Sequence, residues 1–411
     1  MKKIKLSICI LIVGNALLAA PASINSVNDA VKYGVANNPM IKAQSQVLNA
    51  KKNLPKKMGS LSDPKIGFRL NGTPAKNSNY SFDQRRIFIN QSFPFLGKLA
   101  RKNELGNKEV SISELDFEMA KNEVSLSIQS LYYNLVLNKE LVKITEKNNK
   151  IFENIVNIAD IKYRSGKTLQ ANVLKARVSK GKIEEKLLNL AHQEVKITEE
   201  LKKWLGGLDN DLISIAFVYP KPIETTFSAA MPSVIFKTLM VQKAITIKNR
   251  ADQILRVEND RYLPNFSAQV ESWNNSGMEH QYSGQIAMTV PWFNEKNSST
   301  IKEATSLKNA KGNQLVDTQN NVKRLLVTLL SDLKTTKETI KLYDEIILKN
   351  AALSLSSFQK AFEVDKASFL DYFESEKTLF SLEMDYAKLV NRTYILQAKI
   401  TSLFKKGVET E

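Results

Sequence analysis

The sequence predicts a mainly α-helical protein with a small β segment, in which a unit of helix, β-hairpin, long helix and second long helix occurs twice. Three observations lead to this fold class. The 411-residue chain has two long stretches without proline, short segments in which apolar and polar residues alternate, and motifs that recur about 200 positions apart. With 43% hydrophobic and 25% charged residues, the composition is that of a folded chain.

The proline-free stretches predict long helices, because an interior proline breaks a helix. Proline is absent from Lys98 to Tyr219 and from Trp292 onward, and apolar residues recur there at helical spacing, as at Val124, Ile128 and Leu131. The helices expected are 97–164, 168–205, 294–361 and 367–405. Residues 98–164 alone would span roughly 100 Å at about 1.5 Å per residue. On this pattern, a soluble coiled coil is an alternative.

Alternating segments predict two β-hairpins. Ile66, Phe68 and Leu70 fall on one face of a strand, and residues 265–271 and 286–292 alternate in the same way, whereas residues 87–93 are less regular. The strands expected are about 64–72, 84–93, 264–273 and 282–291. Such strands suit the wall of a β-barrel, and a small soluble sheet capping a helical bundle is the alternative.

Aromatic residues near the strand ends suit the interfacial girdle of a membrane barrel. They are Phe95, Trp273, Tyr282, Trp292 and Phe293. Four strands cannot close a barrel with a useful bore, so several chains would have to share one.

Three ordered matches indicate an internal duplication. Asp63-Pro64-Lys65 matches Leu263-Pro264-Asn265, Phe93-Pro94-Phe95-Leu96 matches Val290-Pro291-Trp292-Phe293, and Tyr163–Lys167 matches Phe362–Lys366. We therefore expect a first repeat at 23–205, a linker at 206–232, a second repeat at 233–405 and a C-terminal tail at 406–411.

The first 22 residues have the pattern of a secretory signal peptide. Lys2, Lys3 and Lys5 precede an apolar run from Leu6 to Ala19, and Ala20-Pro21-Ala22 supplies a cleavage site. The only cysteine, Cys9, lies inside this segment, so the exported protein would contain no disulfide. No later segment is apolar enough to predict a transmembrane helix.

Little in the sequence indicates catalysis or nucleic-acid binding. The two histidines, His192 and His280, have no nucleophile elbow, phosphate loop or metal-ligand spacing around them, so we expect no enzyme and no cofactor. Met278, Glu279 and His280 could hold a soft metal, but an ordinary exposed loop is the simpler interpretation. The net charge of +17 is spread along the chain without a motif that reads DNA or RNA.

The duplicated unit and the turn YRSGKTLQANVLKAR (163–177) resemble the TolC family of outer-membrane efflux proteins. The resemblance implies a homotrimer in which three sets of four strands form a 12-stranded barrel in the outer membrane of a Gram-negative bacterium. A helical tunnel would continue it through the periplasm toward an adaptor protein and an inner-membrane pump of the resistance-nodulation-division class. Pro94 and Pro291 would be the swivels between barrel and tunnel. SDPKI (62–66) and FPFLGK (93–98) are most similar to the heavy-metal efflux branch.

The resemblance also implies where the tunnel closes. Asp371 and Glu374 match two acidic residues that ring the constriction. Three further residues in the two turns depart from the family pattern. These are Asn172, Phe362 and Ala367, which replace an acid, a tyrosine and an arginine whose contacts close the pore. An ordinary solvated acidic face beside Glu376 is the alternative. A periplasmic adaptor and a non-transporting structural coiled coil are the alternatives for the whole protein.

Overall fold

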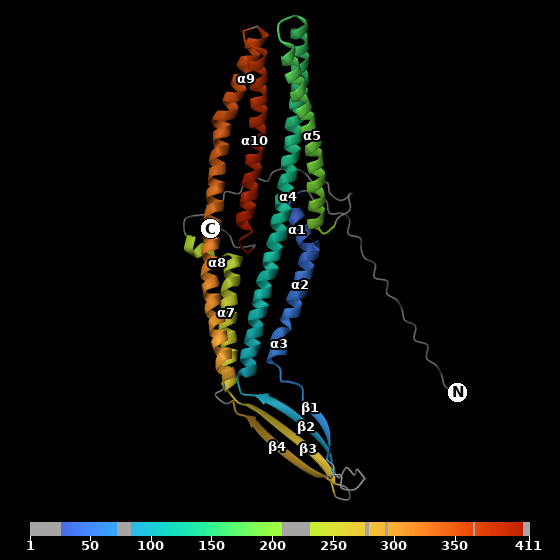
Figure 1. The fold of residues 1–411 in the computed structure, drawn as a ribbon, viewed down its shortest axis with the longest axis vertical. Coiled ribbons are helices and arrows are strands. Elements are labelled where there is room, and N and C mark those ends of the chain that lie inside the picture. The colour runs from blue at the N-terminus through green and yellow to red at the C-terminus, as the bar shows by residue number, and fades with distance from the viewer. Residues whose placement is uncertain are drawn as a thin grey trace, which may run out of the picture.

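Two long helical hairpins stand side by side on a four-stranded antiparallel sheet, and the molecule is strongly elongated (Figure 1). The computed structural model describes residues 26–71, 84–207, 231–275, 279–291, 295–364 and 366–405. The expected signal peptide, most of the expected linker, Trp292, Phe293 and the tail lie outside the described residues. The prediction of a mainly helical chain with a four-stranded antiparallel sheet is confirmed.

The first half of the chain begins with three short helices beside the sheet-proximal part of the longest one. Its elements are α1 (Val27–Asn37), α2 (Pro39–Lys52), α3 (Leu54–Gly59), β1 (Lys65–Asn71), β2 (Gln84–Pro94), α4 (Lys98–Arg164) and α5 (Gln170–Leu205). Sequence fixes the first boundaries: Ser26 caps α1, and Asn38 caps α2 just before Pro39 at the first helical position.

The second half has a similar order of elements. These are α6 (Met231–Phe236), α7 (Leu239–Asn259), the 3-10 turn η2 (Asp260–Tyr262), β3 (Asn265–Asn275), β4 (Gln281–Thr289), α8 (Glu295–Leu342), η3 (Tyr343–Ile347), α9 (Leu348–Glu363) and α10 (Phe369–Thr401). One feature differs from the expected single helix over 294–361. The turn η3 is π-helical, so the second long rod is interrupted where α4 is not.

The core is distributed along the length of the rods. One buried cluster joins α1, α4, α5 and α10 at mid-length, and another joins α4, α5, α9 and α10 at the end far from the sheet. Where α3 crosses α4, Gly106 lies so close to Pro55 that an added Cβ would sit 2.7 Å from the Pro55 Cα. A glycine is therefore required at this crossing.

Candidate functional site

The sheet has two free edges. Its order is β1-β2-β3-β4, and the central pair β2–β3 joins the two halves of the chain. Within the described residues, β1 and β4 each pair on one side only. Unpaired edges leave backbone N–H and C=O groups without ladder partners, so each edge can pair with a strand of another chain.

One face of the sheet is apolar and exposed to the outside. Partners across the ladder place Ile66, Ile89 and Val270 on this face, where they are 73%, 52% and 63% exposed. The other exposed apolar side chains of this face are Phe68, Leu70, Ile87, Phe93, Phe266, Tyr282, Ile286 and Met288. A soluble protein rarely leaves so continuous an apolar patch uncovered.

The opposite face is polar and hydrogen-bonded. Arg86 Nη1 lies 3.1 Å from Glu271 Oε1, and Ser283 Oγ donates to the same carboxylate at 3.1 Å. The Arg86 guanidinium also lies over the Trp273 ring, 5.2 Å from its centroid. The expectation that Trp273 belongs to a lipid-facing girdle is therefore wrong, because its ladder register puts it on the polar face with Arg86. Tyr282 does lie on the apolar face, at 75% exposure.

At the junction of sheet and helices, the motif FPFLGK forms a tight turn. Pro94 ends β2, and the Lys98 N–H donates to the Phe95 carbonyl at 3.1 Å. Gly97 takes φ 91°, as the third residue of a type II turn requires, and α4 begins immediately after it. Pro291 lies two residues after the last residue of β4. Their function as swivels remains a prediction.

Lys98 fastens this turn to the second half of the chain. Its side chain is buried, and Nζ donates to the Leu263 carbonyl at 2.7 Å and to Asn265 Oδ1 at 2.9 Å. Burial lowers the pKa of the Lys98 ammonium. Three residues on, Arg101 Nε donates to Asp260 at 2.7 Å. Sequence reasoning missed this clamp, although a lysine at a helix N-terminus opposes the helix dipole and so signals a local partner.

At the far end, the turns α4–α5 and α9–α10 lie close together (Figure 1). Phe362 is buried there, stacked on Tyr372 with ring centroids 5.5 Å apart. Lys162 Nζ lies 3.7 Å from the centroid of the Phe362 ring. Ala367 packs against the same cluster, whereas the Asn172 amide donates to Thr168 Oγ1 at 2.9 Å. Phe362 and Ala367 therefore belong to an apolar contact within one chain.

The two acidic residues expected at the constriction are both exposed at the start of α10. Asp371 completes a capping box: its carboxylate accepts from the Ser368 N–H and Oγ, and its own N–H donates to Ser368 Oγ. Glu374 forms an exposed pair with Lys377 at 3.5 Å. Both carboxylates point away from the chain's own core and are available to a surface outside it.

Glu376, beside these two carboxylates, is buried and does not share their exposed face, so an ordinary solvated face made by Asp371 and Glu374 stays the alternative. Its side chain is only 5% exposed, and burial raises the pKa of its carboxyl, an effect opposed by the nearby Lys147 and reinforced by Glu383. Its place could have been found in the sequence, because Phe369, Phe373, Glu376 and Phe380 follow one helical stripe.

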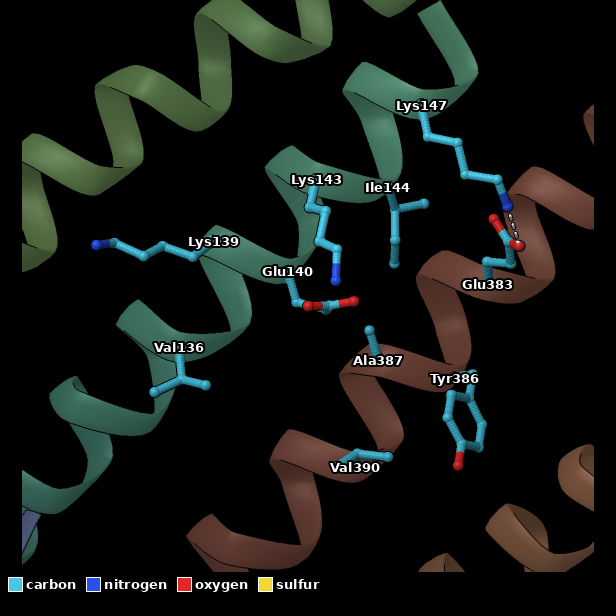
Figure 2. Close-up of a pocket in the computed structure, with 10 residues that line it drawn as sticks. All are labelled: Val136, Lys139, Glu140, Lys143, Ile144, Lys147, Glu383, Tyr386, Ala387 and Val390. Atoms are coloured by element: carbon cyan, nitrogen blue, oxygen red, sulfur yellow. Dashed lines mark hydrogen bonds and ion pairs between the residues drawn. The ribbon is translucent and has the colours of Figure 1, made fainter. Parts of the chain in front are cut away.

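Below this end, a groove of about 1080 Å³ runs between α4 and α10 (Figure 2). Its walls combine the apolar Val136, Ile144 and Val390 with a charged rim. Lys147 bridges the groove to Glu383 at 2.9 Å. Tyr386, which also lines this groove, stacks on Tyr343 of η3 with ring centroids 6.3 Å apart, and burial together with a hydrogen bond to Asp344 raises the pKa of Tyr386 to about 12. The two halves are thus joined here by the Lys147–Glu383 ion pair and by the buried apolar contact of Leu141 with Met384 and Ala387.

Neither His192 nor His280 lies in a group of potential metal ligands among the described residues. Glu279 and His280 are exposed, Met278 lies outside the described residues, and the described part of the chain contains no group of three or more His, Cys, Asp or Glu residues suited to a metal. Among the described helices, none combines the length and the apolar character needed to cross a membrane.

Comparison with known proteins identifies the fold. The sequence matches no protein-family model and no curated protein. Solved structures match over nearly the whole chain. CusC, studied for conformational changes accompanying folding and transmembrane channel formation, has a TM-score of 0.82 at 13% identity, covering 94% of this chain and 95% of that one.

Two further channels give the same result. The outer-membrane channel OprN has a TM-score of 0.81 at 13% identity, covering 92% of this chain and 90% of its own. The MtrE outer-membrane channel of Neisseria gonorrhoeae, in its open state, has a TM-score of 0.76 at 11% identity. The match covers 94% of this chain and 90% of the MtrE chain. The chain therefore has the fold of these outer-membrane channels.

Proposed function

We propose that this protein is the outer-membrane exit duct of a tripartite efflux system and a member of the TolC family. The observation that carries the proposal is the sheet: one face is apolar and exposed, the other is polar, and both edges are free. Lipid would cover the apolar face, and water in a lumen would cover the polar one.

Free edges explain why several chains would share one barrel, and the resemblance to the TolC family gives three as their number. Backbone groups in the hydrocarbon region must be hydrogen-bonded within protein, so β4 of one chain would pair with β1 of the next until the ring closes. Three chains then give twelve strands, and the helical hairpins continue the duct away from the membrane into the periplasm. A periplasmic adaptor and a pump of the resistance-nodulation-division class would deliver the cargo. Heavy-metal cations are the cargo that the likeness of motifs 62–66 and 93–98 favours.

Extraction and conductance test this function together. Mature protein should leave outer membranes only with detergent, as a trimer by light scattering, and should form stable channels in planar bilayers. A freely soluble monomer would contradict the proposal and would favour a periplasmic adaptor or a structural coiled coil.

A further inference from the structure

The polar face of the sheet carries an excess of positive charge. Its charged members in the described residues are Lys65, Arg69, Arg86 and Glu271, which gives three cations and one anion in each chain. If the face lines a lumen shared by three chains, the excess is six positive charges. Low-dielectric walls around a narrow lumen concentrate the field of such charges.

Two of these cations are direct neighbours. Arg69 on β1 and Arg86 on β2 are partners across the ladder, and Trp273 on β3 continues the same row. Like charges directly opposite each other on adjacent strands destabilise a sheet. Only Arg86 has a carboxylate close by, that of Glu271. In the described part of the chain, Arg69 forms no ion pair, and its Cζ instead lies 5.7 Å from the centroid of the Phe88 ring on the same face of the sheet.

The surroundings hold both guanidinium groups on this face. The Phe88 ring lies across Gly67, where an added Cβ would sit 2.3 Å from the ring's Cζ, so the glycine makes room for the ring under Arg69. Trp273 supports Arg86 in the same way. An arginine stacked on an aromatic ring can still donate to a second ligand. In the described part of the chain this holds for Arg69, whereas Arg86 already donates to Glu271 and Gln84.

We propose that this row forms an arginine ring in the barrel lumen that binds anionic groups, such as carboxylates or phosphates, of molecules leaving the duct. The inference rests on the proposed function, because only a closed barrel turns three rows into a ring. Planar guanidinium groups bind these anions through paired hydrogen bonds, and rings of arginine or lysine favour anions in pores.

The adjacent Arg85 provides a matched control. It precedes Arg86 on β2 but its ladder partners, Leu70 and Asn274, belong to the apolar face. Arg69→Gln and Arg85→Gln therefore remove the same charge from opposite faces of the sheet.

The test uses the full-length trimer in planar bilayers, with tripolyphosphate added to one compartment at a time. Tripolyphosphate should block the current of the unsubstituted protein more strongly from the barrel side than from the helical side. Arg69→Gln should raise the half-blocking concentration from the barrel side by about tenfold, whereas Arg85→Gln should leave it unchanged.

Two results would overturn the inference while leaving the exit duct intact: equal block from both sides, or an equal effect of both substitutions. The second would point to general surface charge. A trimer-free preparation without any channel activity would contradict the proposed function itself, and the arginine ring with it.

Discussion

Lys162 and Phe362, 200 positions apart in the chain, meet at the end of the molecule far from the sheet, where the ammonium group lies over the aromatic ring. The contact joins the α4–α5 turn to the α9–α10 turn. Phe362 is one of the three positions at which the resemblance to the TolC family implies a departure from the residues used for closure. A cation–π contact within one chain is therefore available in place of a phenolic hydrogen bond.

Loosening this contact should open the entrance. Phe362→Ala should cost about 3–5 kcal/mol of stability because it empties a buried ring site. Lys162→Met should cost about 0.5–2 kcal/mol because it removes the charge over the ring and the hydrogen bond from Nζ to the Phe362 carbonyl. Both should raise the basal conductance of single channels. Lys360→Met, at an exposed position of α9, is the control, and an equal rise in that variant would disprove the role of the contact.

The acidic pair at the start of α10 should govern cation passage. Asp371→Asn with Glu374→Gln should weaken cation selectivity and block by multivalent cations on the helical side, since three chains would bring six carboxylates together. Loss of the capping carboxylate should cost only about 0.5–1 kcal/mol, so trimers should persist. Single-channel recording with unchanged selectivity and block would place the acidic ring elsewhere.

Glu376 should make the helical end sensitive to pH. Its folded-state pKa is raised, so the stability that it contributes is fully present below its unfolded value near 4.5 and is lost as the pH rises through the folded pKa. Glu376→Gln should therefore stabilise the protein at neutral pH and flatten this part of the pH profile. Thermal unfolding of both proteins between pH 4 and 8 measures the effect, and parallel profiles would show that the Glu376 carboxyl is not responsible.

Gly106 and Gly181 allow two glycine-to-alanine substitutions whose effects on stability should have opposite signs. Gly106→Ala should destabilise by about 1–3 kcal/mol, because the new Cβ would meet the Pro55 backbone, which cannot move aside cheaply. Gly181→Ala, in α5 with nothing within 4 Å, should stabilise by about 0.5–1 kcal/mol through helix propensity. Circular dichroism melts should show shifts of opposite sign, and shifts of the same sign would contradict the close crossing of α3 and α4.

Local pattern was sufficient to predict most of the fold. The absence of proline predicts the long helices, and the alternation of apolar and polar residues predicts the strands. Both signals can be read from the sequence because they depend only on residues close together along the chain. Contacts between the halves were harder. The roles of Lys98 and Glu376 depend on groups from distant segments, Leu263 in one case and Lys147 in the other. The face of the sheet on which Trp273 lies was predicted wrongly. An aromatic residue at a strand end can contact lipid or stack on an arginine, and only the register of the ladder shows which face it occupies.

The π-helical turn η3 makes the two long rods mechanically unequal. From Lys98 to Arg164, α4 is one continuous helix that begins at a clamped junction, and it behaves as a strut. In the other rod, backbone hydrogen bonding changes its period at Tyr343–Ile347, and Tyr386 holds that turn from the side. A local π-helical turn is a common place for a helix to bend, so we expect bending of the second rod to be concentrated there. Movement at the far end would then tilt α9 while leaving the sheet undisturbed.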